Sequence, residues 1–258
     1  MGQDRTDLVA RLRAAGCVFA EDEAALLSLE GYSAAELEAR VSRRVAGEPL
    51  EHVLGWAEFA GLRILVDPGV FRPRPRSELL AWEAVARTPS GAVVVDLCCG
   101  TGAVAAVVDD RCEVAELHAS DLDPAAVACA RRNLSASGAH VHCGDLDEPL
   151  PERLRGRVDV LVCNAPYVPT DSLALMPAEA RDHEAPMALD GGADGLDVLR
   201  RMMTIAPGWL APGGWFLCET STAQTGQAVA ELALRGFATE VVTSEELEAT
   251  VLVAHLQA

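Results

Sequence analysis

The stretch that decides the fold is Val93-Val94-Val95-Asp96-Leu97-Cys98-Cys99-Gly100-Thr101-Gly102, an apolar run that enters a glycine-containing turn. Such a run is typical of a strand buried on both faces of a parallel sheet, and a helical pattern follows the turn. Gly100 and Gly102 permit backbone conformations and a close ligand approach that a side chain would block. Gly100-x-Gly102-x-x-Ala105 also matches the spacing of a dinucleotide fingerprint, but an ordinary strand-to-helix turn explains this match equally well.

Four of the expected strands end in, or are directly followed by, a polar side chain. These strands and side chains are 92–97 with Asp96, 116–121 with Asp121, 140–144 with Asp145, and 158–163 with Asn164. Since the carboxyl ends of parallel strands meet at one edge of a sheet, we expect the four side chains to share that edge. A single acid there can simply cap a helix. Four in succession favour a ligand site, in which a carboxylate such as Asp121 accepts hydrogen bonds from ribose hydroxyls.

The segments after residue 92 alternate between strand and helix patterns. Helices are expected at 103–110, 124–137, 195–210 and 223–235, and a fifth strand at 214–219. This alternation predicts the α/β class, with a mostly parallel Rossmann-like sheet covered on both faces. Alternating apolar and polar residues at 237–243 and 250–255 predict a closing antiparallel hairpin.

Three regions are expected along the chain: a helical region at 1–50, a β-hairpin with a Pro/Arg loop at 51–76, and the strand–helix domain at 77–258. In the helical region, Ser33 and Glu36 have the spacing of a capping box, and apolar residues recur at helical spacing after them. The hairpin strands are expected at 56–59 and 62–66, around a turn at Ala60-Gly61.

The composition argues against several classes of function. The 258 residues carry a formal net charge of −18, so the chain lacks the excess of bases that binding to nucleic-acid phosphates needs. Its 8 cysteines include no C-x-x-C pair, which is typical of reduced residues in a cytoplasmic protein. No apolar run approaches the roughly 20 residues of a membrane span, and the acidic amino terminus does not resemble a signal peptide. We therefore expect a cytoplasmic protein without direct nucleic-acid or membrane binding, and without a metal, since His140 and His142 lack a third ligand.

The loop Asn164-Ala165-Pro166-Tyr167 has the composition of a site for a planar, neutral NH2 group. The Oδ1 of Asn164 and the carbonyl of Ala165 can each accept one N–H, while the ring of Tyr167 stacks beside the group. This arrangement leaves the nitrogen lone pair directed at an electrophile. The loop therefore indicates a transferase that acts on an amide or an aryl amine.

The order of these elements resembles that of class I S-adenosylmethionine-dependent methyltransferases, and the Asn-x-Pro-Tyr loop resembles the [Asn/Asp]-Pro-Pro-Tyr signature of their amino-methylating members. More narrowly, the chain resembles protein glutamine-N(5) methyltransferases of the HemK/PrmC type. These modify the Gln of a Gly-Gly-Gln motif in peptide-chain release factors, or a Gln in a ribosomal protein. The narrower resemblance is carried by residues 49–55 with 59–62, by the Pro/Arg loop 72–78, and by 183–197, which includes Asp190-Gly191-Gly192-Ala193-Asp194-Gly195.

The resemblance implies S-adenosylmethionine as the cofactor and a protein substrate that carries a glutamine, such as a release factor. It implies that region 1–50 takes part in substrate recognition and that 77–258 is the catalytic domain. The implied acceptor site is Asn164, Ala165, Pro166 and Tyr167. The implied cofactor site is Arg74, Asp96, Cys98, Cys99, Gly100, Thr101, Gly102, Asp121, Leu122, Asp145, Leu146 and Asn164. Of these, Cys98 to Gly102 would line the methionine part, Asp121 would bind the ribose, and Asp145 with Leu146 would border the adenine.

The chain departs from the family pattern in four ways. Cys98 replaces the first Gly of the turn, and Ala165 replaces the first Pro of the catalytic loop. The amino-terminal helical region is shorter than the family's, and the carboxyl-terminal hairpin lacks an Asp-x-x-Gly-x-x-Arg segment. A paralogue with another target therefore stays open. So do methylation of the amino group of adenine, N-methylation of a small molecule, and a role as an inactive cofactor-binding subunit.

Overall fold

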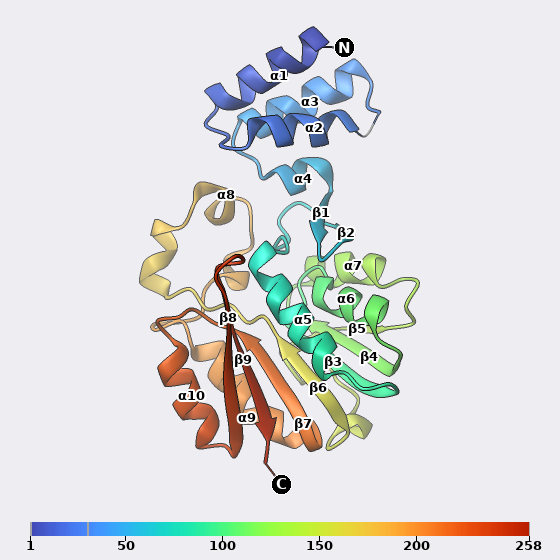
Figure 1. Cartoon of the computed structure of the whole chain (residues 1–258), viewed down its shortest axis with the longest axis vertical. Helices are drawn as coiled ribbons and strands as arrows, with labels where there is room; N and C mark the ends of the chain where they lie inside the picture. Colours follow the sequence, from blue (N-terminus) through green and yellow to red (C-terminus); the bar gives the residue numbers. More distant parts are fainter. Residues whose placement is uncertain (1, 30, 258) are drawn as a thin grey trace.

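The centre of the fold is a sheet that has seven strands in the part of the chain that the structure describes. The structure is a computed structural model that describes residues 2–29 and 31–257. In spatial order the strands are β5 (His140–Cys143), β4 (Val114–Asp121), β3 (Ala92–Leu97), β6 (Val158–Cys163), β7 (Leu210–Glu219), β9 (Ala249–Leu256) and β8 (Phe237–Ser244). The first five are parallel, whereas β9 pairs antiparallel with both β7 and β8. The expected α/β fold with a closing antiparallel hairpin is confirmed (Figure 1).

Helices cover both faces of this sheet. On one face lie α5 (Glu78–Arg87), α6 (Ala103–Arg111) and α7 (Pro124–Asn133), and on the other lie α9 (Asp197–Trp209) and α10 (Thr225–Ala233). Successive strand residues point to opposite faces. Val95 and Leu97 of β3 accordingly belong to the core beneath α9 and α10, whereas Val94 belongs to the core beneath α5 and α6. A strand buried on both faces needs the nearly continuous apolar sequence that β3 has.

The pairing of β3 with β6 brings the glycine-containing turn next to the predicted acceptor loop. Leu97 lies opposite Cys163 in the parallel register. The residues that follow them, Cys98 and Asn164, therefore leave the sheet at neighbouring positions on its carboxyl edge. Asp121 at the end of β4 lies opposite Cys143, which places the ends of β4 and β5 on the same edge.

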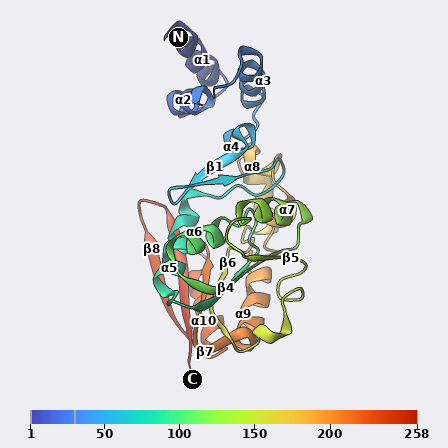
Figure 2. The ribbon, with the colours of Figure 1, turned by 90° about the vertical axis from the view of Figure 1, so that its right-hand side faces the viewer.

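The amino-terminal helices form a small core of their own. These helices are α1 (Gly2–Ala14), α2 (Ala20–Leu29) and α3 (Ala34–Val45), which are set off from the sheet (Figure 2). Ser33 and Glu36 form the expected capping box at the start of α3. The short helix α4 (Leu50–Leu54) connects this region to the sheet domain. Val53 and Leu54 pack in the same core as the three helices, so the packing continues past the expected boundary at residue 50.

Two connections lie at the end of the sheet that faces the amino-terminal helices (Figure 1). The first is the expected hairpin of β1 (Trp56–Phe59) and β2 (Leu62–Leu65), with Ala60 and Gly61 at positive φ in the turn. The second runs from β6 to α9 and contains η3 (Thr170–Leu175), α8 (Ala178–Arg181) and η4 (Pro186–Ala188). Two further 3-10 turns are η1 (Pro75–Ser77) and η2 (Glu152–Leu154). Short turns such as these lack the length for a recognisable apolar period, so sequence patterns did not predict them.

Several element boundaries differ from the expected ones, among them those of α7, α9 and β7. α7 ends at Asn133 and not at 137, and Gly138 follows with a φ of 75°. α9 begins at Asp197, because Gly195 just before it has a φ of 78° that no helix contains. β7 begins at Leu210, where helix was expected, and pairs with Val158 before its register shifts.

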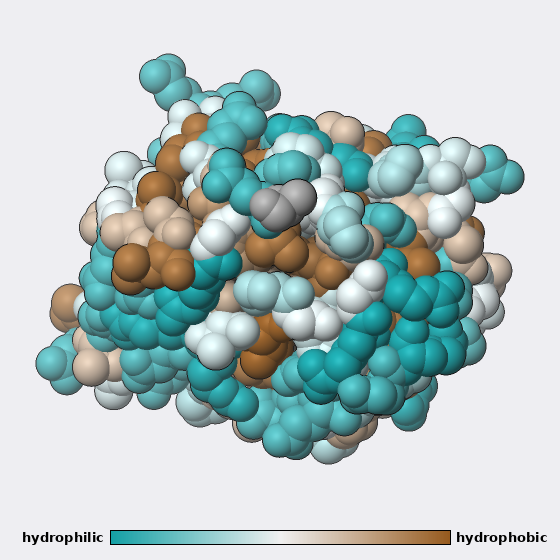
Figure 3. Space-filling model, turned by 90° about the horizontal axis from the view of Figure 1, so that it is seen from below, coloured by the Kyte–Doolittle hydropathy of each residue, from teal (hydrophilic) through white to brown (hydrophobic). Residues whose placement is uncertain are grey.

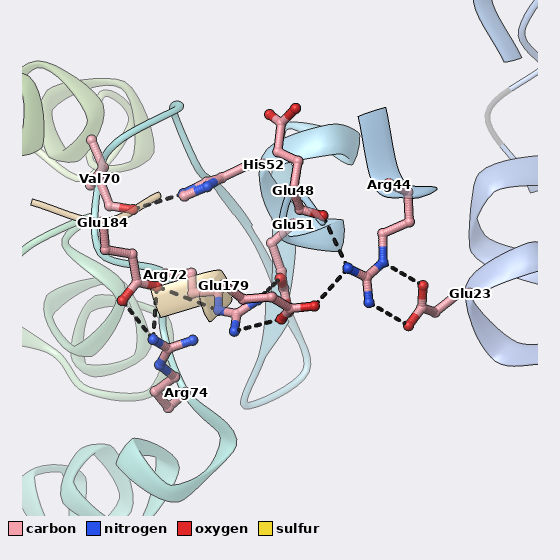
Figure 4. A network of polar contacts seen from close by, with 10 residues as sticks. All are labelled: Glu23, Arg44, Glu48, Glu51, His52, Val70, Arg72, Arg74, Glu179 and Glu184. Carbon is pink, nitrogen blue, oxygen red and sulfur yellow. Dashed lines mark hydrogen bonds and ion pairs between the residues drawn. The ribbon is translucent and has the colours of Figure 1, made fainter. Parts of the chain in front are cut away.

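Ion pairs between buried and partly buried side chains join the amino-terminal helices to the sheet domain (Figure 4). The guanidinium of Arg44 on α3 lies 2.6 Å from Glu23 of α2 and 2.6 Å from Glu179 of α8. Glu179 also accepts from Arg72 at 3.1 Å, and Arg72 pairs with Glu51 of α4 at 2.8 Å. The side chains of Arg44 and Glu23 are only 9% and 10% exposed, so these charges interact away from water.

The opposite end of the molecule offers a mostly hydrophilic surface. Seen from below, apolar residues form small groups between hydrophilic ones (Figure 3). Among the helices of residues 2–29 and 31–257, none has the length and apolar character needed to cross a membrane.

Replacing Arg44 by Met should lower the free energy of unfolding by about 3–5 kcal/mol, because Glu23 would remain buried without its partner. Urea denaturation followed by circular dichroism measures this loss. The matched control is Arg11→Met on α1, whose ion pair with Glu38 is exposed and should contribute about 0–1 kcal/mol. Equal losses in the two variants would contradict the structural role assigned to the buried pair.

Candidate active site

A cleft of about 1040 Å³, counting its open mouth, lies at the carboxyl edge of the parallel strands. Its walls come from the turn after β3, the ends of β4 and β5, and the loop after β6. A smaller cavity adjoins it, and the two share Phe71, Cys98, Gly100 and Asn164 in their walls. The fold therefore concentrates a large concave surface where α/β proteins bind ligands.

Most of the predicted site residues meet in these two cavities. Those that line the main cleft are Arg74, Cys98, Gly100, Asp121, Leu122, Asp145, Leu146, Asn164, Ala165, Pro166 and Tyr167. Asp96, Cys99 and Thr101 line only the smaller cavity. Gly102 lines neither. It has a φ of 76°, and a Cβ added there would lie 3.2 Å from the Cβ of Ala130 on α7, so this glycine permits helix packing.

The turn after β3 is tied to the end of β4 by Asp121. Its Oδ2 accepts the N–H of Gly100 at 2.8 Å, and its Oδ1 accepts the N–H of Asp123 at 2.9 Å. Each carboxylate oxygen keeps a second lone pair, and Asp121 lines the cleft, so it can also accept from ligand hydroxyls. The free lone pairs of Asp121 fit the hydroxyls of the ribose of the expected cofactor. The apolar side chains of Leu122 and Leu146 lie in the same wall and fit its adenine.

Two charged residues of the cleft are already paired within the protein. Arg74 donates to the buried carboxylate of Glu184 at 2.6 Å. Burial and the neighbouring charge of Arg72 lower the pKa of Arg74 to about 10, so this side chain remains positive at neutral pH. Asp145 accepts from Arg201 of α9 at 2.7 Å.

The amide of Asn164 is oriented by a residue outside the predicted set. Its Nδ2 donates to the Oγ of Ser77 at 3.0 Å, and Ser77 is buried. Because the nitrogen is engaged there, Oδ1 is the amide atom left to accept a hydrogen bond in the cleft. This is the orientation that binding of an NH2 group requires.

The segment 189–195 holds the backbone of the acceptor loop. The N–H of Val168 donates to Leu189, and the N–H of Gly191 donates back to the carbonyl of Val168. A Cβ on Gly191 would lie 2.7 Å from the carbonyl oxygen of Pro166, and a Cβ on Gly195 would overlap that of Tyr167. Only glycine permits this approach, which explains why the Gly-rich segment follows the acceptor loop in the sequence.

The side chain of Tyr167 is hydrogen-bonded to a buried carboxylate. Its hydroxyl donates to Oε1 of Glu219 at 2.7 Å, and the Nε of Arg76 lies 3.3 Å from the same oxygen. Glu219 ends β7, the neighbour of β6. Polar residues at the ends of four strands were expected to share one edge, and Glu219 occupies the same position on the fifth. Ser77 was harder to identify from the sequence, because only its position in the Pro/Arg loop indicates a role in the site.

Asp96 is a buried acid that, among residues 2–29 and 31–257, receives a single hydrogen bond, from the N–H of Ala105 at 3.2 Å. Burial raises its pKa to about 7, whereas an unfolded chain titrates near about 3.9. Between pH values of about 3.9 and about 7 the folded protein holds this proton, whereas the unfolded chain has lost it. Asp96 therefore makes the free energy of unfolding fall as pH rises through that range.

Replacing Asp96 by Asn should remove this pH dependence. Relative to the parent chain, the free energy of unfolding of the variant should rise by at least about 1 kcal/mol between pH 5 and pH 8, because Asn stays neutral. Urea denaturation at both pH values measures the difference. Asp110→Asn, at an exposed position, serves as the control. A variant that gains nothing relative to the parent as pH rises would contradict the assignment.

Known proteins are similar to this chain in sequence. The family model described as "Methyltransferase small domain" matches residues 61–207. The release factor glutamine methyltransferase of Geobacter sulfurreducens is 38% identical over 199 residues, which cover 76% of this chain and 69% of that protein. The 4-amino-L-phenylalanine/4-methylamino-L-phenylalanine methyltransferase of Streptomyces pristinaespiralis is 38% identical over 191 residues, covering 71% of this chain and 65% of that one.

The fold also matches solved methyltransferases. A methyltransferase from Pyrococcus furiosus aligns with a TM-score of 0.58 at 16% identity, over 86% of this chain and 98% of that one. At this identity the likeness concerns the fold alone. The sequence relatives, the family model and the cleft agree: the chain belongs to the small-domain methyltransferase family that includes the release factor glutamine methyltransferases, and it is an S-adenosylmethionine-dependent methyltransferase.

Proposed function

We propose that this protein methylates the side-chain amide nitrogen of a glutamine in a protein, with a peptide-chain release factor as the first candidate. The observation that carries the proposal is the orientation of Asn164, whose Nδ2 is engaged by Ser77 and whose Oδ1 is left to accept. A glutamine amide offers two N–H donors, and Asn164 with the carbonyl of Ala165 supplies two acceptors for them.

The residues act by position and electrostatics. When bound, S-adenosylmethionine would supply an electrophilic methyl group on its sulfonium and would leave as the neutral thioether S-adenosylhomocysteine. The turn at Cys98–Gly102 and the carboxylate of Asp121 would hold it. Asn164 and Ala165 orient the acceptor nitrogen and stabilise the positive charge that develops on it. Tyr167 stacks beside the acceptor. The nitrogen then loses its proton to water, so no strong base is required.

A protein target is supported by a second cleft, outside the cofactor cleft. It holds about 1160 Å³, counting its open mouth, between α2 and the Pro/Arg loop, and Val18 and Phe19 are among the residues that line it. Phe19 is 68% exposed and Val18 is 83% exposed, although both are large apolar residues. We propose that this surface of region 1–50 receives the substrate protein, while residues 77–258 carry the chemistry.

A second candidate is N-methylation of a small aryl amine. The observation that favours it is the relative named for 4-amino-L-phenylalanine, which is as similar in sequence as the release factor enzymes. The main cleft also has apolar walls, from Met176, Met187 and Leu189, beside the ring of Tyr167. An aromatic amine can stack there and donate its N–H groups to the same two acceptors.

Intact-mass spectrometry distinguishes the two candidates. The purified protein is incubated with S-adenosylmethionine and, in separate reactions, with a full-length release factor or 4-amino-L-phenylalanine. The proposal predicts one added methyl on the glutamine of the release factor, located by peptide mapping. Methylation of the amino acid alone would replace it by the second candidate. Cofactor binding without transfer to either would favour a different acceptor or an inactive subunit.

Replacing Asn164 by Ala should lower kcat by about 10²–10³-fold, because the variant loses an acceptor that stabilises charge in the transition state. Isothermal titration should show the dissociation constant for S-adenosylmethionine changed by less than about threefold, since other residues hold the cofactor. The matched variant Ser77→Ala should show a smaller loss, because it frees the amide of Asn164 to turn without removing it. Unchanged turnover in Asn164→Ala would refute the assignment of this loop.

Replacing Phe19 by Ser should raise KM for a full-length release factor about tenfold, because an aromatic anchor is lost from the proposed docking surface. KM for a short Gly-Gly-Gln peptide should stay unchanged, since such a peptide reaches only the main cleft. Leu234→Ser, at a position that is 86% exposed after α10, is the control. Equal KM values for the full-length substrate in both variants would contradict the proposed role of region 1–50 in substrate recognition.

A further inference from the structure

Glu219 is a buried carboxylate at the edge of the active site with a role that methyl transfer, as described above, does not use. It is 2% exposed at the end of β7. Its Oε1 lies 2.7 Å from the hydroxyl of Tyr167 and 3.3 Å from Nε of Arg76. Its Oε2 is also buried and has no hydrogen-bond partner among the described residues. Burying a carboxylate with so few partners is unfavourable, so its presence needs an explanation.

Glu219 is not needed to hold the backbone of the acceptor loop. The carbonyl of Tyr167 accepts from Nε2 of Gln224 at 3.0 Å, and Gly195 packs against that same carbonyl. The side chain of Tyr167 has a different set of partners, namely the carboxylate of Glu219 and the guanidinium of Arg76, which lies 5.8 Å from the centre of the ring. Loop position and ring orientation are therefore controlled by separate residues.

We propose that Glu219 is a positioning residue that fixes the ring of Tyr167 beside the acceptor and makes the face of that ring more negative. The proposal deepens the proposed function and rests on it, because it assumes an acceptor nitrogen stacked on Tyr167. A hydrogen bond to a carboxylate is short and strong, and it increases the electron density of the phenol. A ring face with more negative charge attracts the positive charge that develops on the acceptor nitrogen.

The hydroxyl of Tyr167 keeps its proton throughout. Burial, followed by the negative charge of Glu219, raises the pKa of Tyr167, while the positive charge of Arg76 opposes the shift. No bond is formed or broken by Glu219, and the proton released after methyl transfer leaves to water. Glu219 therefore acts through Tyr167 and not on the acceptor itself.

The contact can be measured without any acceptor, because the chain has only 2 tyrosines. In a Tyr32→Phe background, absorbance at alkaline pH reports the ionisation of Tyr167 alone. With Glu219 present the phenol should ionise at a pH above the ordinary value of about 10, and Glu219→Gln should move its ionisation toward that value. Arg76→Gln should move it in the opposite direction, because Arg76 favours the ionised phenol. Circular dichroism confirms that each variant is folded at the pH values used.

The catalytic part is tested with Glu219→Gln, which keeps the size of the side chain and an acceptor for the hydroxyl of Tyr167. Its kcat should fall about tenfold, while KM for the acceptor and the dissociation constant for S-adenosylmethionine change less than about twofold. Tyr167→Phe should give a similar fall, and the double variant should fall no further, since both act through one contact. Glu240→Gln, an equal change of charge on the exposed edge strand β8, is the matched control.

Either of two results overturns the proposal: the same ionisation midpoint for Tyr167 in the parent and in Glu219→Gln, or an additive loss of kcat in the double variant. The kinetics use a Gly-Gly-Gln peptide or 4-amino-L-phenylalanine, whichever the parent protein methylates. If the parent methylates neither, the proposed function fails, and the tyrosine titration decides by itself whether Glu219 controls Tyr167.

Discussion

The close approach of Gly191 and Gly195 to the carbonyls of the acceptor loop is the constraint on which the active site depends. The loop contains one proline, Pro166, which fixes φ at its own position but has no N–H to donate, so hydrogen bonds and contacts from outside the loop are needed to hold its shape. The segment 189–195 provides the missing rigidity, through hydrogen bonds to Val168 and contacts that leave no room for a Cβ. The proposed acceptors for an NH2 group would thereby be fixed before a substrate binds, which is what electrostatic catalysis needs.

Ion pairs also hold the loop beside the cleft in a fixed position. The chain carries a large excess of acids, yet Arg72, Arg74 and Arg76 lie together in one loop beside the cleft. Each pairs with a glutamate from another part of the chain, so the loop is joined to α4, to the segment after β6 and to β7. The glutamate partners are buried or partly buried, which makes these pairs sensitive to the loss of either member. The same set of contacts continues through Glu179 to Arg44 and thereby reaches the amino-terminal helices.

The sequence predicted the sheet well because parallel strands buried on both faces have continuous apolar runs, as β3 and β6 do. The rim residues Asp121 and Asn164 were predictable for the same reason, since strand ends are identifiable once the strands are. Residues that act through tertiary contacts were harder to find. Ser77 matters only because Asn164 lies 3.0 Å away, and Gly102 proved to pack against α7 and not to line the cleft. The short helix α8, which supplies Glu179, is too brief to leave a periodic pattern.

The most direct test of the central claim is a crystal structure of the protein with S-adenosylhomocysteine and a Gly-Gly-Gln peptide. We expect the glutamine side chain to enter the main cleft and to stack on Tyr167. Its NH2 group should donate to Oδ1 of Asn164 and to the carbonyl of Ala165, while Nδ2 of Asn164 stays on Ser77. A glutamine bound elsewhere, or an Asn164 amide turned with its nitrogen toward the acceptor, would contradict it.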